Sequence, residues 1–398
     1  MKPITIIGSG LAGYTLAREF RKLDKTTPLL IITGDDGGFY SKPMLSNAFA
    51  LGKPPEQLQS QTVEQMAAQL NAHILTRTMV SSINTDAQTV QTNLGEFDYS
   101  QLILALGAQV IRLPIAGNAA DQVLSVNNLA DYTVFRDRLT QVGDKVNVTI
   151  LGAGLIGCEF SDDLATTGHT VTLVDPNALP LAALAPVAIS QGLQTALMEK
   201  GVQLKLGVTA SQIDRQDQAL HVTLSNGDSL ITDVVLSAVG LRADTRLAQA
   251  AQLHTGRGII VDEYGQTSAP NVYALGDCAQ YTLGDGNQSV MPYVAPLMAA
   301  ARSIALSLSG QRTRIDMKPA AVMVKTPSYP VALIAPAAHI STSGAWESEH
   351  SEGVTTSRFF DGARVMRGFA VAPHSAKSRT ALMNELTDAQ MADQTSMP

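Results

Sequence analysis

The sequence predicts an α/β protein with two Rossmann-like dinucleotide-binding domains and a small α+β domain at its C-terminal end. Three observations lead to this fold class. A short apolar strand, a Gly-x-Gly-x-x-Gly turn and a helix follow one another in residues 4–23, and the same succession begins again at residue 148. A third strand, residues 272–275, ends in Gly276-Asp277. Because the first glycines of the two turns lie 152 − 8 = 144 residues apart, we expect one chain to bind two dinucleotides.

Length and composition indicate an ordinary globular protein of two or three domains. The chain has 398 residues, of which 45% are hydrophobic and 16% charged, and one core rarely organises so many. The formal net charge of −7 argues against nucleic acid as a partner. Strand-like residues begin at Ile4, and the apolar segment 290–309 contains two prolines and an arginine. We therefore expect a cytoplasmic protein without a secretory signal or a membrane span.

The cysteines and histidines give no sign of thiol or metal chemistry. Cys158 and Cys278 lack the close spacing of a redox-active pair. We expect both to be small buried hydrophobic residues. The seven histidines are scattered without ligand spacing, so the sequence predicts no metal site.

The first glycine-rich turn has the features of a pyrophosphate cradle. Gly8 permits the tight turn, Gly10 lets backbone N–H groups approach the phosphates, and Gly13 lets the helix pack closely on the strand. The N-terminus of the helix then faces the anion. The predicted cradle comprises Gly8, Ser9, Gly10, Leu11, Ala12 and Gly13.

The second strand departs from the usual pattern at its tip. Residues 29–32 are apolar, and Thr33 stands where an acid usually holds the adenosine ribose. Asp35 and Asp36 are displaced from that position. We therefore expect the backbone of Thr33 and Gly34 to hold this ribose, rather than either aspartate.

The second cradle contains Gly152, Gly154 and Gly157, and here the next strand does end in an acid. Asp175 follows the first glycine by 175 − 152 = 23 residues, close to the usual interval. A carboxylate at this position accepts the ribose hydroxyls of NAD and repels a 2′-phosphate by about 4 kcal/mol at ~4 Å before screening. Since no arginine cluster follows it, we predict a preference for NADH over NADPH.

Glu159 lies on the first turn of the helix that follows the second cradle, and it has two interpretations. A carboxylate there complements the positive end of the helix dipole. Alternatively, Glu159 faces Lys42 across the nicotinamide pocket and forms an ion pair beside the cofactor of the first cradle.

Six segments, taken in order, resemble one family of proteins. They are GSGLAG, FYSKPMLS, LGAGLIGCEF, SAVGLRADT, NVYALGDCA and VMVKTP. Together they are similar to the pyridine nucleotide-disulfide oxidoreductases, and YSKPMLS, PNVYALGDCA and VKTP more specifically resemble the rubredoxin-NAD reductases. The resemblance implies an FAD-binding domain in residues 1–112 and 245–318, with an NAD-binding domain, residues 113–244, inserted in it. A C-terminal interface domain would occupy residues 319–398.

The resemblance also implies residue roles toward the cofactors FAD and NAD. Asp277 would hold the ribityl chain of the flavin, and the segment with Lys42 would lie across the isoalloxazine. A strand expected at residues 73–80 would end at Val80, whose backbone would meet the adenine. Gly240 would touch the nicotinamide half of NAD. Val294 would begin a helix whose N-terminus points at the flavin carbonyls.

By this resemblance, electrons pass from NADH through FAD to rubredoxin, which supplies an alkane hydroxylase. No residue of the chain is expected to act as a catalytic acid, base or nucleophile. A ferredoxin-NAD reductase of an oxygenase system is the alternative. An NADH oxidase is disfavoured because such enzymes need a reactive cysteine near the flavin. A flavoprotein that responds to NADH by binding another protein is a non-enzymatic alternative.

Lys325 and its basic neighbours bear on the partner. Lys325 resembles a residue that approaches the flavin from the C-terminal domain, although a solvated lysine on an edge strand would look the same. Rubredoxins are acidic, so a basic run is a candidate docking surface, or merely a solvated face. The run comprises Arg302, Arg312, Arg314, Lys318 and Lys325, with Asp316 as the acid among them.

Overall fold

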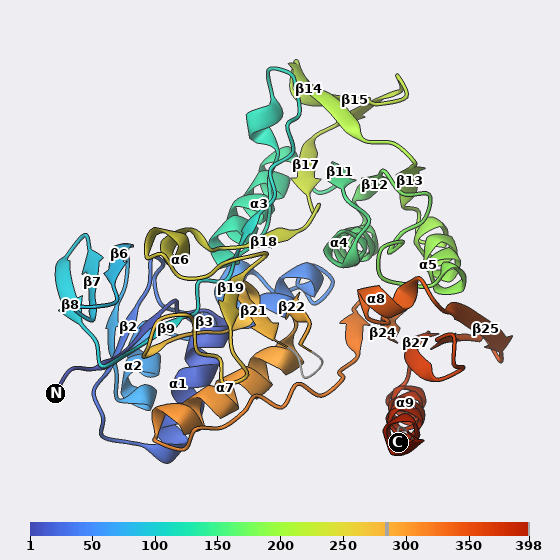
Figure 1. Ribbon diagram of the computed structural model, residues 1–398. Helices are drawn as coiled ribbons and strands as arrows, with labels where there is room; N and C mark the ends of the chain where they lie inside the picture. Colours follow the sequence, from blue (N-terminus) through green and yellow to red (C-terminus); the bar gives the residue numbers. More distant parts are fainter. Residues whose placement is uncertain (283–285, 397–398) are drawn as a thin grey trace. The chain divides into compact units, whose positions relative to one another are not determined.

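The computed structural model describes residues 1–282 and 286–396 and divides the chain into two compact units (Figure 1). Unit 1 comprises residues 1–42, 56–110 and 241–318, and unit 2 comprises residues 43–55, 111–240 and 319–398. Each unit contains a parallel sheet, and one strand of that sheet leads into a glycine-rich cradle. The predicted fold class is confirmed. The four domain boundaries stay a prediction.

Unit 1 is built on a five-stranded parallel sheet with the order β20-β9-β1-β2-β5. All four residues of the central strand β1 (Ile4–Ile7) are buried, as expected for a parallel strand that is covered on both faces. Helices α1 (Leu11–Leu23) and α7 (Val294–Leu308) pack against each other, in blue and orange in Figure 1. The other strands are β2 (Leu29–Ile32), β5 (His73–Leu75), β9 (Gln101–Leu104) and β20 (Val272–Ala274).

Smaller elements complete unit 1. An antiparallel meander contains β6 (Val80–Asn84), β7 (Thr89–Thr92) and β8 (Gly95–Asp98). A second small sheet contains β19 (Ile259–Val261), β21 (Ala279–Thr282) and β22 (Gln288–Val290). Two strand pairs join β3 (Phe39–Tyr40) to β4 (Gln59–Gln61) and β10 (Ala108–Val110) to β18 (Leu241–Ala243). The remaining helices are α2 (Val63–Leu70) and α6 (Arg246–Ala250).

Unit 2 contains a four-stranded parallel sheet with the order β13-β12-β11-β17. These strands are β11 (Asn147–Leu151), β12 (Thr170–Asp175), β13 (Gln203–Leu206) and β17 (Val234–Ser237). Helices α3 (Leu129–Val142), α4 (Leu155–Thr166) and α5 (Val187–Glu199) belong to the same part of the chain. A meander consists of β14 (Ala210–Gln216), β15 (Ala219–Leu224) and β16 (Ser229–Thr232).

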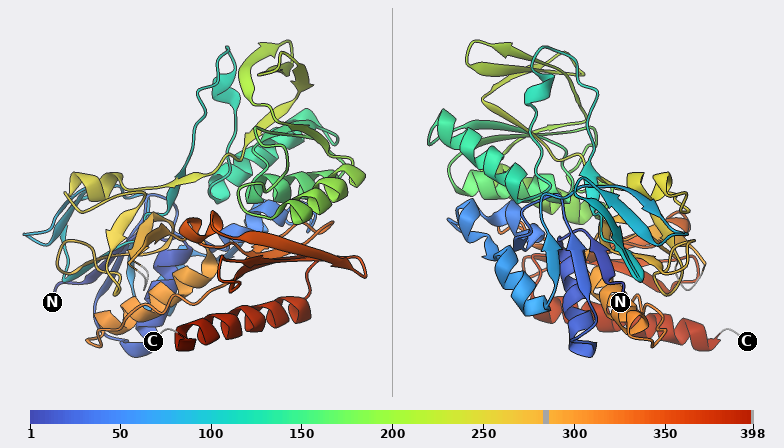
Figure 2. Two further views of the ribbon diagram at one scale, coloured as in Figure 1. Left: turned by 45° about the vertical axis from the view of Figure 1, so that its right-hand side comes forward. Right: turned by 90° about the vertical axis from the view of Figure 1, so that its left-hand side faces the viewer.

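The C-terminal part of unit 2 is a five-stranded antiparallel sheet with the order β23-β24-β27-β26-β25. Helix α9 (Ala376–Ser396) packs on β27, as Figure 2 shows, and α5 contacts β26 and β27. Gly192 of α5 permits a close approach, since a Cβ there would lie 2.2 Å from the hydroxyl oxygen of Tyr329. The strands are β23 (Val322–Val324), β24 (Val331–Ile334), β25 (Ala345–Ser351), β26 (Val354–Phe360) and β27 (Met366–Ala372), with a short helix α8 (Ala338–Ser341).

No helix within the described part of the chain combines the length and the apolar character that a membrane crossing needs.

Candidate nucleotide-binding sites

The first cradle lies between β1 and α1 and is shaped by its glycines. Gly8 has φ +113°, and a Cβ there would lie 2.2 Å from the carbonyl oxygen of Ala105. A Cβ on Gly13 would lie 2.0 Å from the carbonyl oxygen of Gly8. Around Gly10, by contrast, no described atom lies within 4 Å of the position a Cβ would take. Gly8 and Gly13 are therefore required by packing, whereas Gly10 opens onto space that a ligand can fill.

The N-terminus of α1 is suited to an anion. Gly10 is the N-cap and offers no side chain to the first turn of the helix, so the N–H groups of that turn remain available to a phosphate. Leu11 and Ala12 form the first turn. These features fit the pyrophosphate of FAD.

A second group of predicted residues gathers around η4 (Gly276–Cys278), at the end of β20. Gly276 has φ +76°, and a Cβ there would lie 2.8 Å from the Cβ of Ala12. Asp277 is thereby held beside the N-terminal turn of α1, and its Oδ2 lies 3.8 Å from Nζ of Lys42. Unit 1 thus brings the first cradle, Asp277 and Lys42 together.

Val294 begins α7, and its N-cap residue Tyr293 places no side chain on the first-turn N–H groups. Helix α7 contacts η4, and a Cβ on Gly276 would lie 3.8 Å from Cδ1 of Leu297 in the first turn of α7, so this helix end lies near Asp277. Val80 begins β6 rather than ending a strand. The backbone contacts expected from Val80 and Val294 to the flavin stay predictions.

The second cradle repeats the geometry of the first. A Cβ on Gly152 (φ +103°) would lie 2.7 Å from the carbonyl oxygen of Ala238, and one on Gly157 would lie 1.8 Å from that of Gly152. No described atom lies within 4 Å of the corresponding position on Gly154. Gly154 caps α4 without a side-chain hydrogen bond. The second cradle therefore fits a pyrophosphate by the same criteria as the first.

Asp175, the last residue of β12, is directed at the second cradle. Its Oδ2 accepts a hydrogen bond of 2.6 Å from the backbone N–H of Ala153, and its Oδ1 accepts bonds of 2.8 Å from Asn177. The side chain is buried. Gly240, predicted to meet the nicotinamide half, has φ +109° and accepts a bond of 3.2 Å from the N–H of Ile111.

Glu159 of α4 is fully buried and forms an ion pair with Lys325. Nζ of Lys325 lies 2.5 Å from Oε2 of Glu159, and the backbone N–H of Lys325 donates to Oε1 at 2.8 Å. The hydroxyl of Ser46 also donates to Oε2. Lys325, 34% exposed, is therefore more than a solvated edge lysine. The predicted pairing of Glu159 with Lys42, which belongs to unit 1, stays a prediction.

Two further buried carboxylates of α4 were missed by sequence reasoning. Oδ2 of Asp162 accepts bonds from the N–H and hydroxyl of Ser328, at 2.9 and 2.7 Å. Asp163 accepts bonds from the backbone N–H groups of Phe49 and Ala50, at 3.0 and 2.9 Å. Burial raises the pKa of Asp163 to about 6. The available signal was three acids within five residues of a largely apolar helix.

Both cysteines are buried free thiols, which confirms the sequence expectation. Burial raises the pKa of Cys278 to about 12 and also raises that of Cys158. Since the thiolate is the reactive form, neither side chain is prepared for nucleophilic or redox chemistry.

Three members of the basic run that lie in unit 1 are paired with acids, two of them with acids distant in sequence. Arg312 lies 3.8 Å from Asp262, and Arg314 lies 3.0 Å from Glu263. Lys318 lies 3.3 Å from its near neighbour Asp316. These pairs reduce the positive field that the run would present to a partner.

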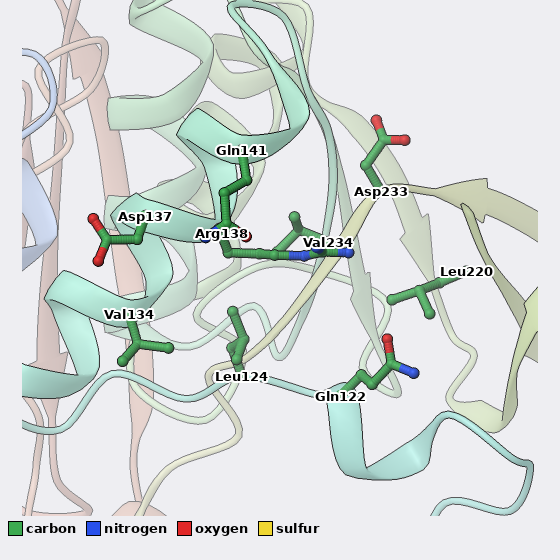
Figure 3. A pocket seen from close by; sticks show the side chains of 9 residues that line it. All are labelled: Gln122, Leu124, Val134, Asp137, Arg138, Gln141, Leu220, Asp233 and Val234. Carbon is green, nitrogen blue, oxygen red and sulfur yellow. The ribbon is translucent and has the colours of Figure 1, made fainter. Parts of the chain in front are cut away.

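Unit 2 also has an open hollow of about 420 Å³, and Figure 3 shows the side chain of Arg138 extending toward Val234. No residue predicted to bind a cofactor lines it. The lining residues are Gln122, Leu124, Val134, Asp137, Arg138, Gln141, Leu220, Asp233 and Val234.

Comparisons with known proteins agree with two nucleotide sites in one chain. Residues 2–302 match the family model described as pyridine nucleotide-disulphide oxidoreductase, and residues 314–386 match the rubredoxin binding C-terminal domain. In fold, the chain is similar to the putidaredoxin reductase–putidaredoxin complex, with a TM-score of 0.87 at 24% identity, covering 98% of this chain and 93% of that one.

The chain belongs to the pyridine nucleotide-disulphide oxidoreductase family, whose cofactors are FAD and NAD. Within it, the chain is similar to two curated rubredoxin-NAD(+) reductases. The one from Alcanivorax borkumensis is 44% identical over 390 residues, 97% of this chain and 99% of the relative. The one from Acinetobacter baylyi is 41% identical over 403 residues, 98% of this chain and 100% of the relative. The resemblance stated from the sequence is confirmed.

Proposed function

We propose that this protein carries electrons from NADH through FAD to rubredoxin. The observation that carries the proposal is a match to a rubredoxin-binding domain in the same chain as two nucleotide cradles. Relatives named for this activity extend over nearly the whole chain. FAD supplies the chemistry that converts a two-electron hydride donor into a source of single electrons.

The residues of this chain bind and orient the nucleotides rather than take part in covalent chemistry. The N–H groups that follow Gly10 hold the FAD pyrophosphate, and those that follow Gly154 hold that of NAD. Asp277, which pairs with Lys42, accepts hydrogen bonds from the flavin side chain. The buried thiols of Cys158 and Cys278 offer no competing acceptor for electrons.

The setting of the reaction is part of the proposal. Rubredoxin reduced in this way supplies an alkane hydroxylase, and the protein works in the cytoplasm, where NADH is available. The free thiols support a reducing compartment. Growth of a deletion strain on alkanes tests the first point, with growth on acetate as the control.

Acceptor competition tests the proposed function. Purified protein receives NADH with rubredoxin, a ferredoxin or oxygen alone, and cytochrome c reports the flow of electrons to the carriers. We expect that turnover requires rubredoxin. The kcat/KM for the ferredoxin should be about ten-fold or more below the kcat/KM for rubredoxin. Equal rates with the ferredoxin would favour the alternative reductase, and equal rates with oxygen alone would favour an oxidase.

A further inference from the structure

We infer that Asp35 binds the adenosine ribose of FAD in place of the acid that the tip of β2 lacks. Thr33 occupies the usual position of that acid and is buried. Its backbone N–H donates to the carbonyl oxygen of Leu75 at 2.9 Å, and its own carbonyl oxygen accepts from Thr78 at 2.8 Å. The backbone N–H of Thr33 is therefore already engaged and is not available to the ribose.

Asp35 is anchored to the first cradle through one of its two carboxylate oxygens. Oδ1 accepts hydrogen bonds from the hydroxyls of Ser9 and Thr33, at 2.9 and 2.6 Å, and from the N–H of Gly37 at 3.0 Å. All the hydrogen bonds that Asp35 accepts from described side chains and N–H groups reach this oxygen. The second oxygen, Oδ2, remains available to a ligand beside the cradle.

The backbone around Asp35 is fixed as well. Its carbonyl oxygen accepts a bond of 2.8 Å from the N–H of Arg77. Gly34 lies against Met79, since a Cβ on Gly34 would come within 2.6 Å of the Met79 sulfur. Met79 itself is 64% exposed, so an apolar surface lies next to the turn that carries the carboxylate. An adenosine matches both the carboxylate and the apolar surface, because its ribose is polar and the faces of its adenine ring are apolar.

The chemistry suits a ribose diol. Two adjacent hydroxyls are hydrogen-bond donors, and a carboxylate oxygen accepts such bonds more strongly than a neutral oxygen does. Asp36 is adjacent but, among the described residues, is not tied to the cradle: its Oδ1 accepts a bond from the N–H of Gly38 at 3.0 Å, whereas Asp35 also accepts bonds from Ser9 and Thr33. Asp36 therefore provides a matched control.

The test compares flavin analogues with full-length protein from which the flavin has been removed. FAD and FAD with a 2′-deoxyadenosine half are titrated against wild type, Asp35→Ala and Asp36→Ala, with flavin fluorescence as the readout. Hydrogen bonds to charged groups stabilise by roughly 1.5–3 kcal/mol. We therefore expect wild type and Asp36→Ala to bind FAD about ten- to a hundred-fold more tightly than the deoxy analogue. Asp35→Ala should bind the two within about two-fold of each other.

The comparison separates a ribose contact from loosening of the cradle. If Asp35 only positions Ser9 and Thr33, Asp35→Ala weakens both flavins equally and keeps the wild-type preference for FAD. That result would overturn the inference, and so would a wild type that binds the two flavins equally. Thermal melting of each flavin-free variant reports whether the substitution unfolds the chain. If Asp35→Ala unfolds, Asp35→Asn replaces it, and the same loss of preference is required.

Discussion

We predict that Asp175 decides which nicotinamide nucleotide the second cradle accepts. Its carboxylate is held by the N–H of Ala153 within that cradle, so a 2′-phosphate would meet a negative charge in a buried setting. At ~4 Å and an effective dielectric near 20 the repulsion is about 4 kcal/mol, which salt reduces. Asp175→Ala should lower the ratio of kcat/KM for NADH to that for NADPH by about ten- to a hundred-fold. Asp233→Ala, a change at the hollow of Figure 3, should leave the ratio unchanged; an equal fall there would contradict the assignment.

The ion pair between Glu159 and Lys325 stabilises unit 2 because each charge removes the cost of burying the other. Glu159→Gln leaves the ammonium group half-buried without its anion, so we expect a loss of about 1–3 kcal/mol in the free energy of unfolding. Adding Lys325→Met should recover part of that loss. Chemical denaturation of the two variants provides the measurement, and a double variant less stable than Glu159→Gln would contradict this explanation.

Asp163 makes the stability of unit 2 depend on pH. Its pKa of about 6 in the folded chain lies above the ordinary value of 3.8, so the folded state binds the proton more tightly. The resulting stabilisation, on the order of 3 kcal/mol, is present below pH 4 and is lost as the pH rises through 6. Relative to Asp163→Asn, wild type should therefore lose stability between pH 4 and 7. Melting temperatures of the two proteins across this range would show it, and a constant difference would refute it.

At the scale of elements, different glycines of a cradle serve folding and ligand binding. A Cβ on Gly13 would clash with the backbone of Gly8, so Gly13→Ala should lower the melting temperature by several degrees or prevent folding. Gly10→Ala meets no described atom and has an ordinary negative φ of −66°. It should fold normally but bind FAD about ten-fold or more weakly, because the methyl group occupies the phosphate space. Flavin content and melting curves distinguish these outcomes; normal FAD affinity in Gly10→Ala would contradict the proposed site.

Gly154→Ala is the corresponding change in the second cradle, and here too no described atom opposes the added methyl group. We expect the variant to retain FAD and its melting temperature while the KM for NADH rises about ten-fold. Steady-state kinetics at saturating acceptor provides the measurement. Loss of FAD instead would show that the two cradles had been assigned the wrong nucleotides.

Both cradles could be predicted from sequence because the spacing of their glycines is a local pattern: Gly13 packs on Gly8 and Gly157 packs on Gly152, although Gly8 and Gly152 also lie against distant backbone. The strand expected at residues 73–80 was wrong for the opposite reason. It ends at Leu75 and a new strand begins at Val80, since Arg77 adopts a positive φ of 48° and bonds to the carbonyl oxygen of Asp35. That partner lies more than forty residues away, and no local pattern announces it.

The carboxylates of α4 show the same limit. Glu159 was recognised as a candidate, but Ser46 and Lys325, which bind it, come from opposite ends of the chain. The basic run likewise showed only Asp316 among its positive charges in sequence, because Asp262 and Glu263 pair with it from about fifty residues away. Which charges neutralise each other depends on tertiary structure, whereas the presence of a nucleotide cradle does not.

For the whole molecule, each compact unit combines segments that are distant in the sequence. Residues 43–55, the middle of the chain and its C-terminal part form one compact unit. The three buried acids of α4 hold the first and last of these segments. The segment that follows Lys42 therefore belongs to the same compact unit as the residues predicted to bind NAD, which a search for motifs alone does not reveal.

The central claim is that electrons pass from NADH to FAD and on to rubredoxin without visiting a thiol. Anaerobic titration of the yellow protein with NADH, followed by mixing with oxidised rubredoxin, tests it most directly. We expect one equivalent of NADH to bleach the flavin and two rubredoxins to restore its absorbance, with both cysteines present as thiols before and after. Consumption of a second equivalent of NADH, or a bleached flavin that rubredoxin does not reoxidise, would contradict the account.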